Sequence, residues 1–399
     1  MSKDFLIVAA ALVLGGGGYY AANAWYVVAV DASSGCGGTC DPSASPPVTQ
    51  PTLAAAESLA PLSVRLGEGN LLTGVPGDGR LSVEEVRAWL ADPDVHRPLA
   101  IELPVGLDEG AADVRLPADN PLTRAKIELG RQLFFDPRLS GDRTVSCATC
   151  HDPDHGYAQP TALAEGIGGA AGRRNTPTAA NRLLSSTQFH DGRAASLEEQ
   201  ALGPIASDAE MGGSHAAVVD LIRRVEGYRL QFERVFGRDS PAFAQVRLTS
   251  EPYDAGPMTI ENVGRAIAAF ERALVSGPTP WDHDRRLRRF EAAYADDLAD
   301  PEWLANEEPE LAAEHAELVR QAKAAPLDEA ARRGAELFFG DRTGCALCHA
   351  GASFSDGEYH NLGVGYLGDG AFDDLGRFEV TGADEDRGAF KTPTLRNIA

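Results

Sequence analysis

The chain has little positive charge for its length. Its 399 residues include 36 lysines and arginines against 59 aspartates and glutamates, which gives a formal net charge of −23. Such a chain repels phosphate groups, which argues against a nucleic acid as a partner, whereas it would attract a basic protein. No run of any length alternates apolar and polar residues as an amphipathic strand does. We therefore predict a mainly α-helical protein of two or three domains.

Only one long stretch, Phe5–Val30, has no charged residue. Two interpretations fit it. It could be a signal peptide with an apolar region and a cleavage site at Ala22-Asn-Ala24, or a retained membrane anchor, since about 20 apolar residues span a bilayer. We favour the anchor for residues 1–30. Either interpretation predicts an exported, periplasmic protein, anchored in the second case to the inner membrane.

Cysteine is also scarce, and four of the six cysteines belong to two copies of one motif: Cys147-Ala-Thr-Cys150-His151 and Cys345-Ala-Leu-Cys348-His349. This spacing attaches a c-type haem, because the two thiols form thioethers with the haem vinyl groups and the histidine ligates the iron. A zinc site or a redox dithiol does not need a histidine directly after the second cysteine. The sequence therefore predicts two covalently bound haem c groups, with His151 and His349 as iron ligands.

The other two cysteines, Cys36 and Cys40, have no histidine after them. Outside the cytoplasm a local disulfide is the simplest interpretation. Metal binding and lipidation at Cys36 stay open as alternatives.

The two haem motifs follow similar segments, Leu129–Asp136 and Arg333–Gly340, which indicates an internal repeat of domain size. We predict two cytochrome c-like haem domains behind an N-terminal hydrophobic segment and linker. The linker and a small variable region are predicted at 31–115. The N-terminal haem domain follows at 116–255 and the C-terminal haem domain at 256–399, and the second of these contains a helical insertion at about 283–323. Helices are predicted at 122–135, 261–274 and 328–339, and two more in the insertion.

Beyond the haem motifs, the chain resembles the bacterial dihaem cytochrome c peroxidases and their MauG-like relatives. The resemblance runs from about Leu122 to the C-terminus, apart from the insertion. The motifs that carry it are Leu133–Ser140, Arg174–Thr178, Asp191–Arg193, Leu197–Pro204, Glu210–Gly212, Phe354–Asp356, Tyr359–Asn361 and Phe390–Asn397.

The resemblance implies that the haem on His151 reacts with peroxide and that the haem on His349 takes in electrons. It implies that Glu210 is the distal acid–base group and that Gln200 and Pro204 shape the distal pocket. Peroxide cleavage in any case needs a group that moves a proton between the two oxygens. The family also holds a calcium ion between the haems, and Asn175 matches its side-chain ligand.

The chain departs from the family pattern at three places. Many members have a histidine that closes the resting N-terminal haem, whereas Ile167 stands there and no histidine occurs between Gly156 and Phe189. We therefore expect an open haem, as in the MauG-like branch. His190 replaces the family's inter-haem tryptophan, and we expect it to act between the haems. The sequence stops at Ala399, before the position of the distal ligand of the second haem, so that ligand cannot be assigned and a truncated product is expected.

These features predict an exported dihaem peroxidase that reduces hydrogen peroxide to water. Electrons would come from a small periplasmic cytochrome c or cupredoxin, and the enzyme would form a homodimer. Two alternatives stay open. One is a MauG-like enzyme that uses peroxide to oxidise tryptophan or tyrosine in a partner protein. The other is a non-enzymatic dihaem electron carrier.

Overall fold

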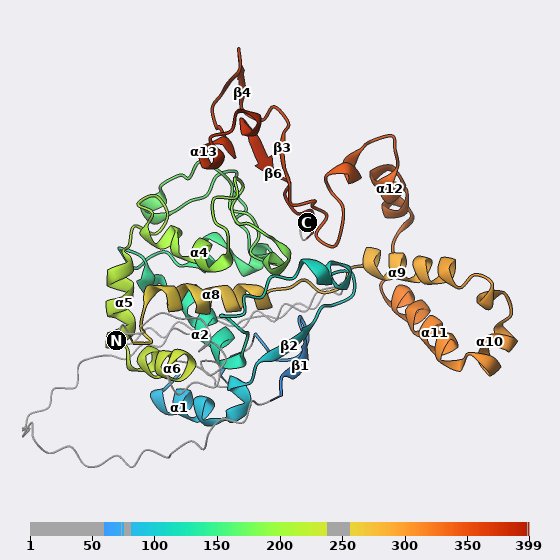
Figure 1. Ribbon diagram of the computed structural model, residues 1–399, viewed down its shortest axis with the longest axis horizontal. Helices are drawn as coiled ribbons and strands as arrows, with labels where there is room; N and C mark the ends of the chain where they lie inside the picture. The colour runs from blue at the N-terminus through green and yellow to red at the C-terminus, as the bar shows by residue number, and fades with distance from the viewer. Residues whose placement is uncertain (1–59, 73, 76–80, 238–255, 397, 399) are drawn as a thin grey trace, which may run out of the picture. The chain divides into compact units, whose positions relative to one another are not determined.

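The computed structural model describes residues 60–72, 74–75, 81–237, 256–396 and 398 (Figure 1). The predicted signal or anchor segment and the first part of the linker region, residues 31–59 with Cys36 and Cys40, lie outside these residues. Among the helices of the described part, none combines the length and the hydropathy that crossing a bilayer requires.

The described chain is mainly helical, as predicted. The helices are α1 (Val83–Ala91), α2 (Arg124–Phe134), α3 (Cys147–Cys150), α4 (Leu197–Leu202), α5 (His215–Arg224), α6 (Glu226–Phe236), α8 (Ile260–Ala273), α9 (Pro280–Ala293), α10 (Pro301–Glu307), α11 (Pro309–Ala324), α12 (Glu329–Phe339) and α13 (Phe378–Thr381). The strands are β1 (Leu62–Arg65), β2 (Leu99–Glu102), β3 (Tyr359–Asn361), β4 (Tyr366–Gly368), β5 (Ala371–Phe372) and β6 (Ala389–Lys391).

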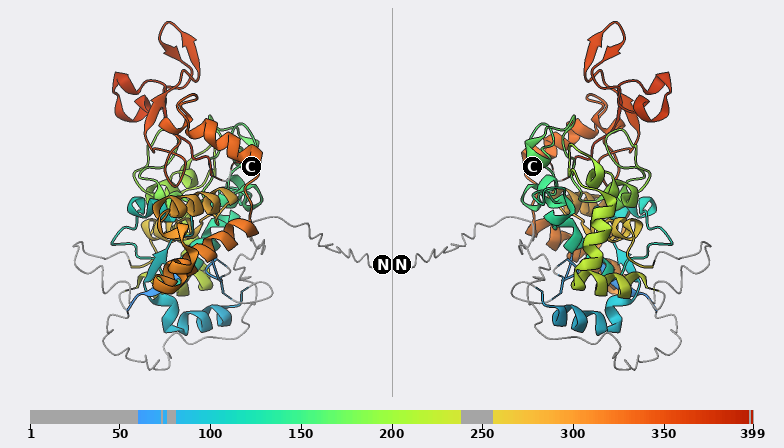
Figure 2. Two further views of the ribbon diagram at one scale, coloured as in Figure 1. Left: turned by 90° about the vertical axis from the view of Figure 1, so that its right-hand side faces the viewer. Right: turned by 90° about the vertical axis from the view of Figure 1, so that its left-hand side faces the viewer.

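The strands form three two-stranded sheets in the described residues. β1 pairs in parallel with β2, whereas β3 pairs antiparallel with β6 and β4 with β5. Strands β3 to β6, red in Figure 2, all come from the C-terminal part of the chain. Each strand has only two to four residues, which is too short for a period of two to stand out in the sequence.

Helices α2 and α8 form the centre of the core, and both were predicted from the sequence. Thr123 caps α2, because its hydroxyl accepts a hydrogen bond from the backbone N–H of Lys126. The apolar face of α8 is fully buried, and α8 packs against α2. The close approach requires Gly130, since a Cβ at this position would collide with the carbonyl group of Ala266.

The described residues of the predicted linker region contribute to the same core. Leu66, Val86 and Leu90 are buried in one hydrophobic cluster with residues of α2, α6 and α8, and α1 packs against α6. Burial of these side chains fixes this region on the module that carries the first haem motif.

Residues Gly277–Arg332 form a compact unit of their own. It contains α9, α10 and α11, and α9 packs against α11. The unit has three main helices where the sequence predicted two, because Pro309 starts a new helix directly after α10 ends at Glu307. The domain bounds given above remain a prediction.

Candidate active site

The first haem motif lies on a short helix that leads directly into His151. Cys147 and Cys150 begin and end α3, and neither forms a disulfide. The backbone N–H of His151 donates to the carbonyl of Cys147 at 2.8 Å, and its Nδ1 atom lies 3.2 Å from the carbonyl oxygen of Tyr157. A carbonyl only accepts, so Nδ1 carries the proton, and the Nε2 lone pair is left for a metal.

The second haem motif repeats this arrangement. Cys345 opens a 3-10 helix that ends at Leu347, and the N–H of His349 donates to the carbonyl of Cys345 at 2.9 Å. The Nδ1 atom of His349 lies 2.9 Å from the carbonyl oxygen of Phe354. Nε2 of His349 is therefore also the atom free to ligate iron, and both motifs fit a covalently attached haem.

An aromatic pair lies beside each of the two histidines in a similar arrangement. Phe134 and Phe135 meet edge-on at 5.5 Å between ring centres, and Phe338 and Phe339 do so at 4.9 Å. Phe134 lies 6.2 Å from the ring of His151, and Phe338 lies 6.5 Å from that of His349. Each approach helix thus presents an apolar wall to its own haem motif.

The two approach helices differ in what covers them. In α2, Leu133 and Phe134 are completely buried under α8 and its neighbours. In α12, Leu337, the equivalent of Leu133, is 48% exposed and Phe339, the equivalent of Phe135, is 40% exposed, and Leu347 inside the haem motif is 83% exposed. The described residues therefore bury the first haem site much more than the second.

One folded segment carries the three residues predicted to act on peroxide. Gln200 lies on α4, and Pro204 opens the 3-10 helix Pro204–Ala206 directly after it. The chain then turns back, because the N–H of Met211 donates to the carbonyl of Pro204 at 3.3 Å. This turn places Glu210 beside Pro204, although the two are six positions apart in the sequence.

Contacts from a second loop bring Glu210 to the first haem motif. The backbone N–H of Ile167 donates to the carbonyl of Glu210 at 2.8 Å, and Cys150 Sγ lies 3.6 Å from the carbonyl oxygen of Glu165 on the same loop. Burial and the negative charge of Glu210 both raise the pKa of the Cys150 thiol. Glu210 is therefore within electrostatic reach of the cysteine that would carry the haem.

Ile167, the residue in place of the family's histidine, lies against this segment. A Cβ on Gly212 would meet its side chain at 3.0 Å. An isoleucine side chain has no lone pair to offer iron, so Ile167 contributes bulk here and not a metal ligand.

His190 joins two distant parts of the chain. Its Nε2 atom lies 3.0 Å from the carbonyl oxygen of Asn175 and therefore donates to it, while its own carbonyl accepts from the N–H of Lys391 in β6 at 2.8 Å. Burial lowers the pKa of His190, which favours the neutral ring. The preceding Phe189 adopts φ of 65°, a costly conformation for a non-glycine residue that fixes this turn.

An ion-pair network that the sequence did not predict joins the same two parts. Arg174 donates to both carboxylate oxygens of Asp374 at 2.8 Å and to Asp191 at 2.6 Å. The hydrogen bonds from Arg174 lower the pKa of Asp374 to about 2. Arg174 and Asp191 lie in motifs noted above, but Asp374 is 200 residues from Arg174 and carries no local signal.

Asn175, the predicted calcium ligand, is exposed. Its side-chain Nδ2 donates to the carbonyl groups of Thr161 at 2.6 Å and Gln159 at 3.3 Å. These bonds orient the amide, so that the Oδ1 atom is the group with which it could bind a cation.

The chain is similar to known di-haem proteins in sequence and in fold. Residues 124–289 match a family model described as di-haem cytochrome c peroxidase. The chain is 35% identical over 284 residues to the methylamine utilization protein MauG of Methylorubrum extorquens, covering 71% of this chain and 64% of that protein. It is 32% identical to cytochrome c551 peroxidase of Nitrosomonas europaea, covering 68% of this chain and 65% of that protein.

Among solved structures, the crystal structure of a MauG-like protein associated with microbial copper homeostasis is similar, with a TM-score of 0.53 and 28% identity. The match covers 71% of this chain and 73% of that one. The chain spans 64% and 65% of the length of the two relatives named above. Two haem c groups are the cofactors of proteins of this kind, and the chain belongs to the di-haem cytochrome c peroxidase family.

Proposed function

We propose that the protein is a periplasmic peroxidase that reduces hydrogen peroxide with two electrons and two protons to two molecules of water. Cys147, Cys150 and His151 would hold the haem at which peroxide reacts, and Cys345, Cys348 and His349 would hold the haem that takes in electrons. A small electron-donor protein, a cytochrome c or a cupredoxin, would supply those electrons. The observation that carries the proposal is the position of Glu210, within electrostatic reach of Cys150 and beside Ile167.

The bound haem on His151 would supply the iron position to which peroxide binds and the electrons that break its O–O bond. Glu210 would take a proton from the oxygen nearer the iron and deliver it to the outer oxygen, which then leaves as water. The amide of Gln200 would orient the peroxide by hydrogen bonding. Pro204 has no N–H of its own and would limit the room for water in the pocket.

A MauG-like reaction, in which peroxide drives oxidation of a tryptophan or tyrosine in a partner protein, is the second candidate. Ile167 favours this reaction, because its side chain cannot ligate the iron of the first haem as a histidine would. An open first haem is what we expect for the MauG-like branch. A membrane tether and a homodimer remain predictions from the sequence.

The test is stopped-flow absorbance of the diferric holoprotein mixed with hydrogen peroxide, first alone and then with a reduced small c-type cytochrome. The peroxidase predicts a rapid change in the haem spectrum followed by fast oxidation of the added cytochrome. A long-lived oxidised protein that ignores the cytochrome would favour the MauG-like reaction. No spectral change with peroxide would contradict both and leave the electron carrier.

We also propose one calcium ion near Asn175, on the strength of the family resemblance and the orientation of its amide. Removal of calcium with EGTA should slow oxidation of the donor cytochrome, because Asn175 lies next to His190 at the junction of the two haem-bearing parts. Added Ca²⁺ should restore the rate, whereas Mg²⁺ should not, since it needs a smaller and more regular set of ligands. An unchanged rate, with no calcium detected in the purified protein, would contradict the proposal.

A further inference from the structure

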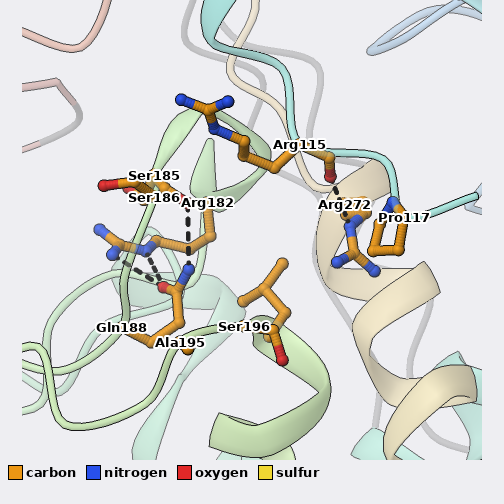
Figure 3. A pocket seen from close by; sticks show the side chains of 10 residues that line it. Arg115, Pro117, Arg182, Ser185, Ser186, Gln188, Ala195, Ser196 and Arg272 are labelled. Carbon is orange, nitrogen blue, oxygen red and sulfur yellow. Dashed lines mark hydrogen bonds between the residues drawn. The ribbon is translucent and has the colours of Figure 1, made fainter.

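A small cavity of about 120 Å³ lies on the module of the first haem motif, and serines and arginines stand among apolar residues such as Pro117 and Leu197 in its lining (Figure 3). Three serines, Ser185, Ser186 and Ser196, and three arginines, Arg115, Arg182 and Arg272, line it. In the view of Figure 3, Arg182 and Gln188 lie on one side and Arg272 on the other. The cavity has room for a small ion or one carboxylate group.

The charge of Arg272 is already balanced. Its guanidinium donates to both carboxylate oxygens of Glu198, at 2.6 and 2.8 Å, and its Nε donates to the carbonyl of Arg115 at 2.9 Å. This arginine closes one wall of the cavity and needs no further anion.

Arg182 is different, because its hydrogen bonds all go to neutral groups. Its Nε and one terminal nitrogen donate to Gln188 Oε1 at 3.0 and 2.8 Å, and the same terminal nitrogen reaches the carbonyl of Thr187 at 3.3 Å. Within the described residues it has no ion pair with a carboxylate. Burial lowers the pKa of Arg182 only to about 10, so it stays charged at neutral pH.

The acidic side chain that acts electrostatically on Arg182 does not balance this charge. Glu271 of α8 is 4% exposed, and its Oε2 atom has no hydrogen-bond partner among the described residues. Burial raises the pKa of Glu271 to about 8, against the attraction of Arg272 and Arg182. At neutral pH the carboxyl group is therefore mostly protonated, and Arg182 retains an uncompensated positive charge at the cavity wall.

We propose that this cavity is an anion site, in which Arg182 and the serine hydroxyls bind a carboxylate or another small oxoanion, with Arg115 at its rim. Two sources could supply this chemistry: a free ion such as phosphate, or a propionate of the haem attached to Cys147 and Cys150. An anion placed here would pair with the guanidinium of Arg182, whose hydrogen bonds within the described residues go to neutral groups, in a form that suits its planar donors.

The experiment compares the wild-type holoprotein with Arg182→Gln and Arg182→Lys, and needs no peroxide. Thermal unfolding is measured with inorganic phosphate and with chloride at equal ionic strength. Resonance Raman spectra of the haems then report the bending bands of the propionates. A free anion predicts that saturating phosphate raises the unfolding midpoint of the wild type by about 2–4 °C and leaves Arg182→Gln unchanged.

A haem propionate predicts a different result: phosphate has no effect on the wild type, and Arg182→Gln shifts a propionate band, with a smaller shift in Arg182→Lys. Arg115→Gln, at the exposed rim, should weaken whichever effect is seen without threatening the fold. Arg87→Gln, an exposed arginine of α1 paired with Glu226, is the control and should change neither signal. If phosphate has no effect and no variant moves a propionate band, the proposal is wrong, whatever the outcome of the peroxide test.

Discussion

Replacement of Glu210 by glutamine should slow the reaction of the holoprotein with hydrogen peroxide by about 10²- to 10⁴-fold, the range expected when a general acid–base group is removed. Glutamine has nearly the same size and can still hydrogen-bond, but it cannot take up and release a proton. Both haems should attach normally, because the motif cysteines and histidines are untouched. Stopped-flow rates at several peroxide concentrations measure the effect.

The matched control is Asp208→Asn, which neutralises an exposed carboxylate on the same loop. It should change the rate by less than about twofold, since exposed charges are screened by salt. Equal slowing in both variants would mean that loop charge, and not proton transfer, limits the reaction. A Glu210→Gln variant with the wild-type rate would remove Glu210 from the mechanism.

Replacement of Glu198 by alanine should lower the free energy of unfolding by about 3–5 kcal/mol, because it leaves the guanidinium of Arg272 buried without its carboxylate partner. Arg272 is 2% exposed, and Glu198 accepts two hydrogen bonds from it and a third from Asn120 Nδ2 at 2.7 Å. These bonds tie α4, which carries Gln200, to α8 in the core. Urea unfolding of the holoprotein, followed by circular dichroism, measures the loss.

The neighbouring Glu199→Ala is the matched control. Glu199 is exposed and accepts one backbone hydrogen bond, from the N–H of Ala195, so its loss should cost less than about 1 kcal/mol. A similar loss of unfolding free energy in both variants would show that capping of α4, and not the buried ion pair with Arg272, stabilises the fold here.

The same pair predicts how stability depends on pH. Burial opposes ionisation of Glu198, but the hydrogen bonds and charge of Arg272 outweigh it and lower the pKa of this carboxyl group. A lowered pKa in the folded state means that the stabilisation is present above the ordinary glutamate pKa and is lost as the pH falls below it. The difference between wild type and Glu198→Ala should therefore shrink in acid.

The sequence alone determined the features that depend on short stretches of chain. The Cys-x-x-Cys-His spacing specifies both haem sites, because the two thiols and the histidine must lie on one turn to reach one haem. The predicted helices α2, α8 and α12 formed within a residue or two of their expected bounds, since a period of 3.6 residues is a local property. The repeat of the two phenylalanine pairs could also be read from the sequence.

The tertiary structure decided what depends on residues far apart in the chain. Glu210 reaches Cys150 only because a loop through Ile167 folds onto it, and His190 meets Lys391 only through strand pairing near the C-terminus. The uncompensated charge of Arg182 is a feature of the same kind. Packing of the core decides which side chains lie next to this guanidinium, and so whether a carboxylate balances its charge. Local spacing is set by backbone geometry, whereas the pairing of distant groups is set by how the core packs, and no short stretch of sequence records it.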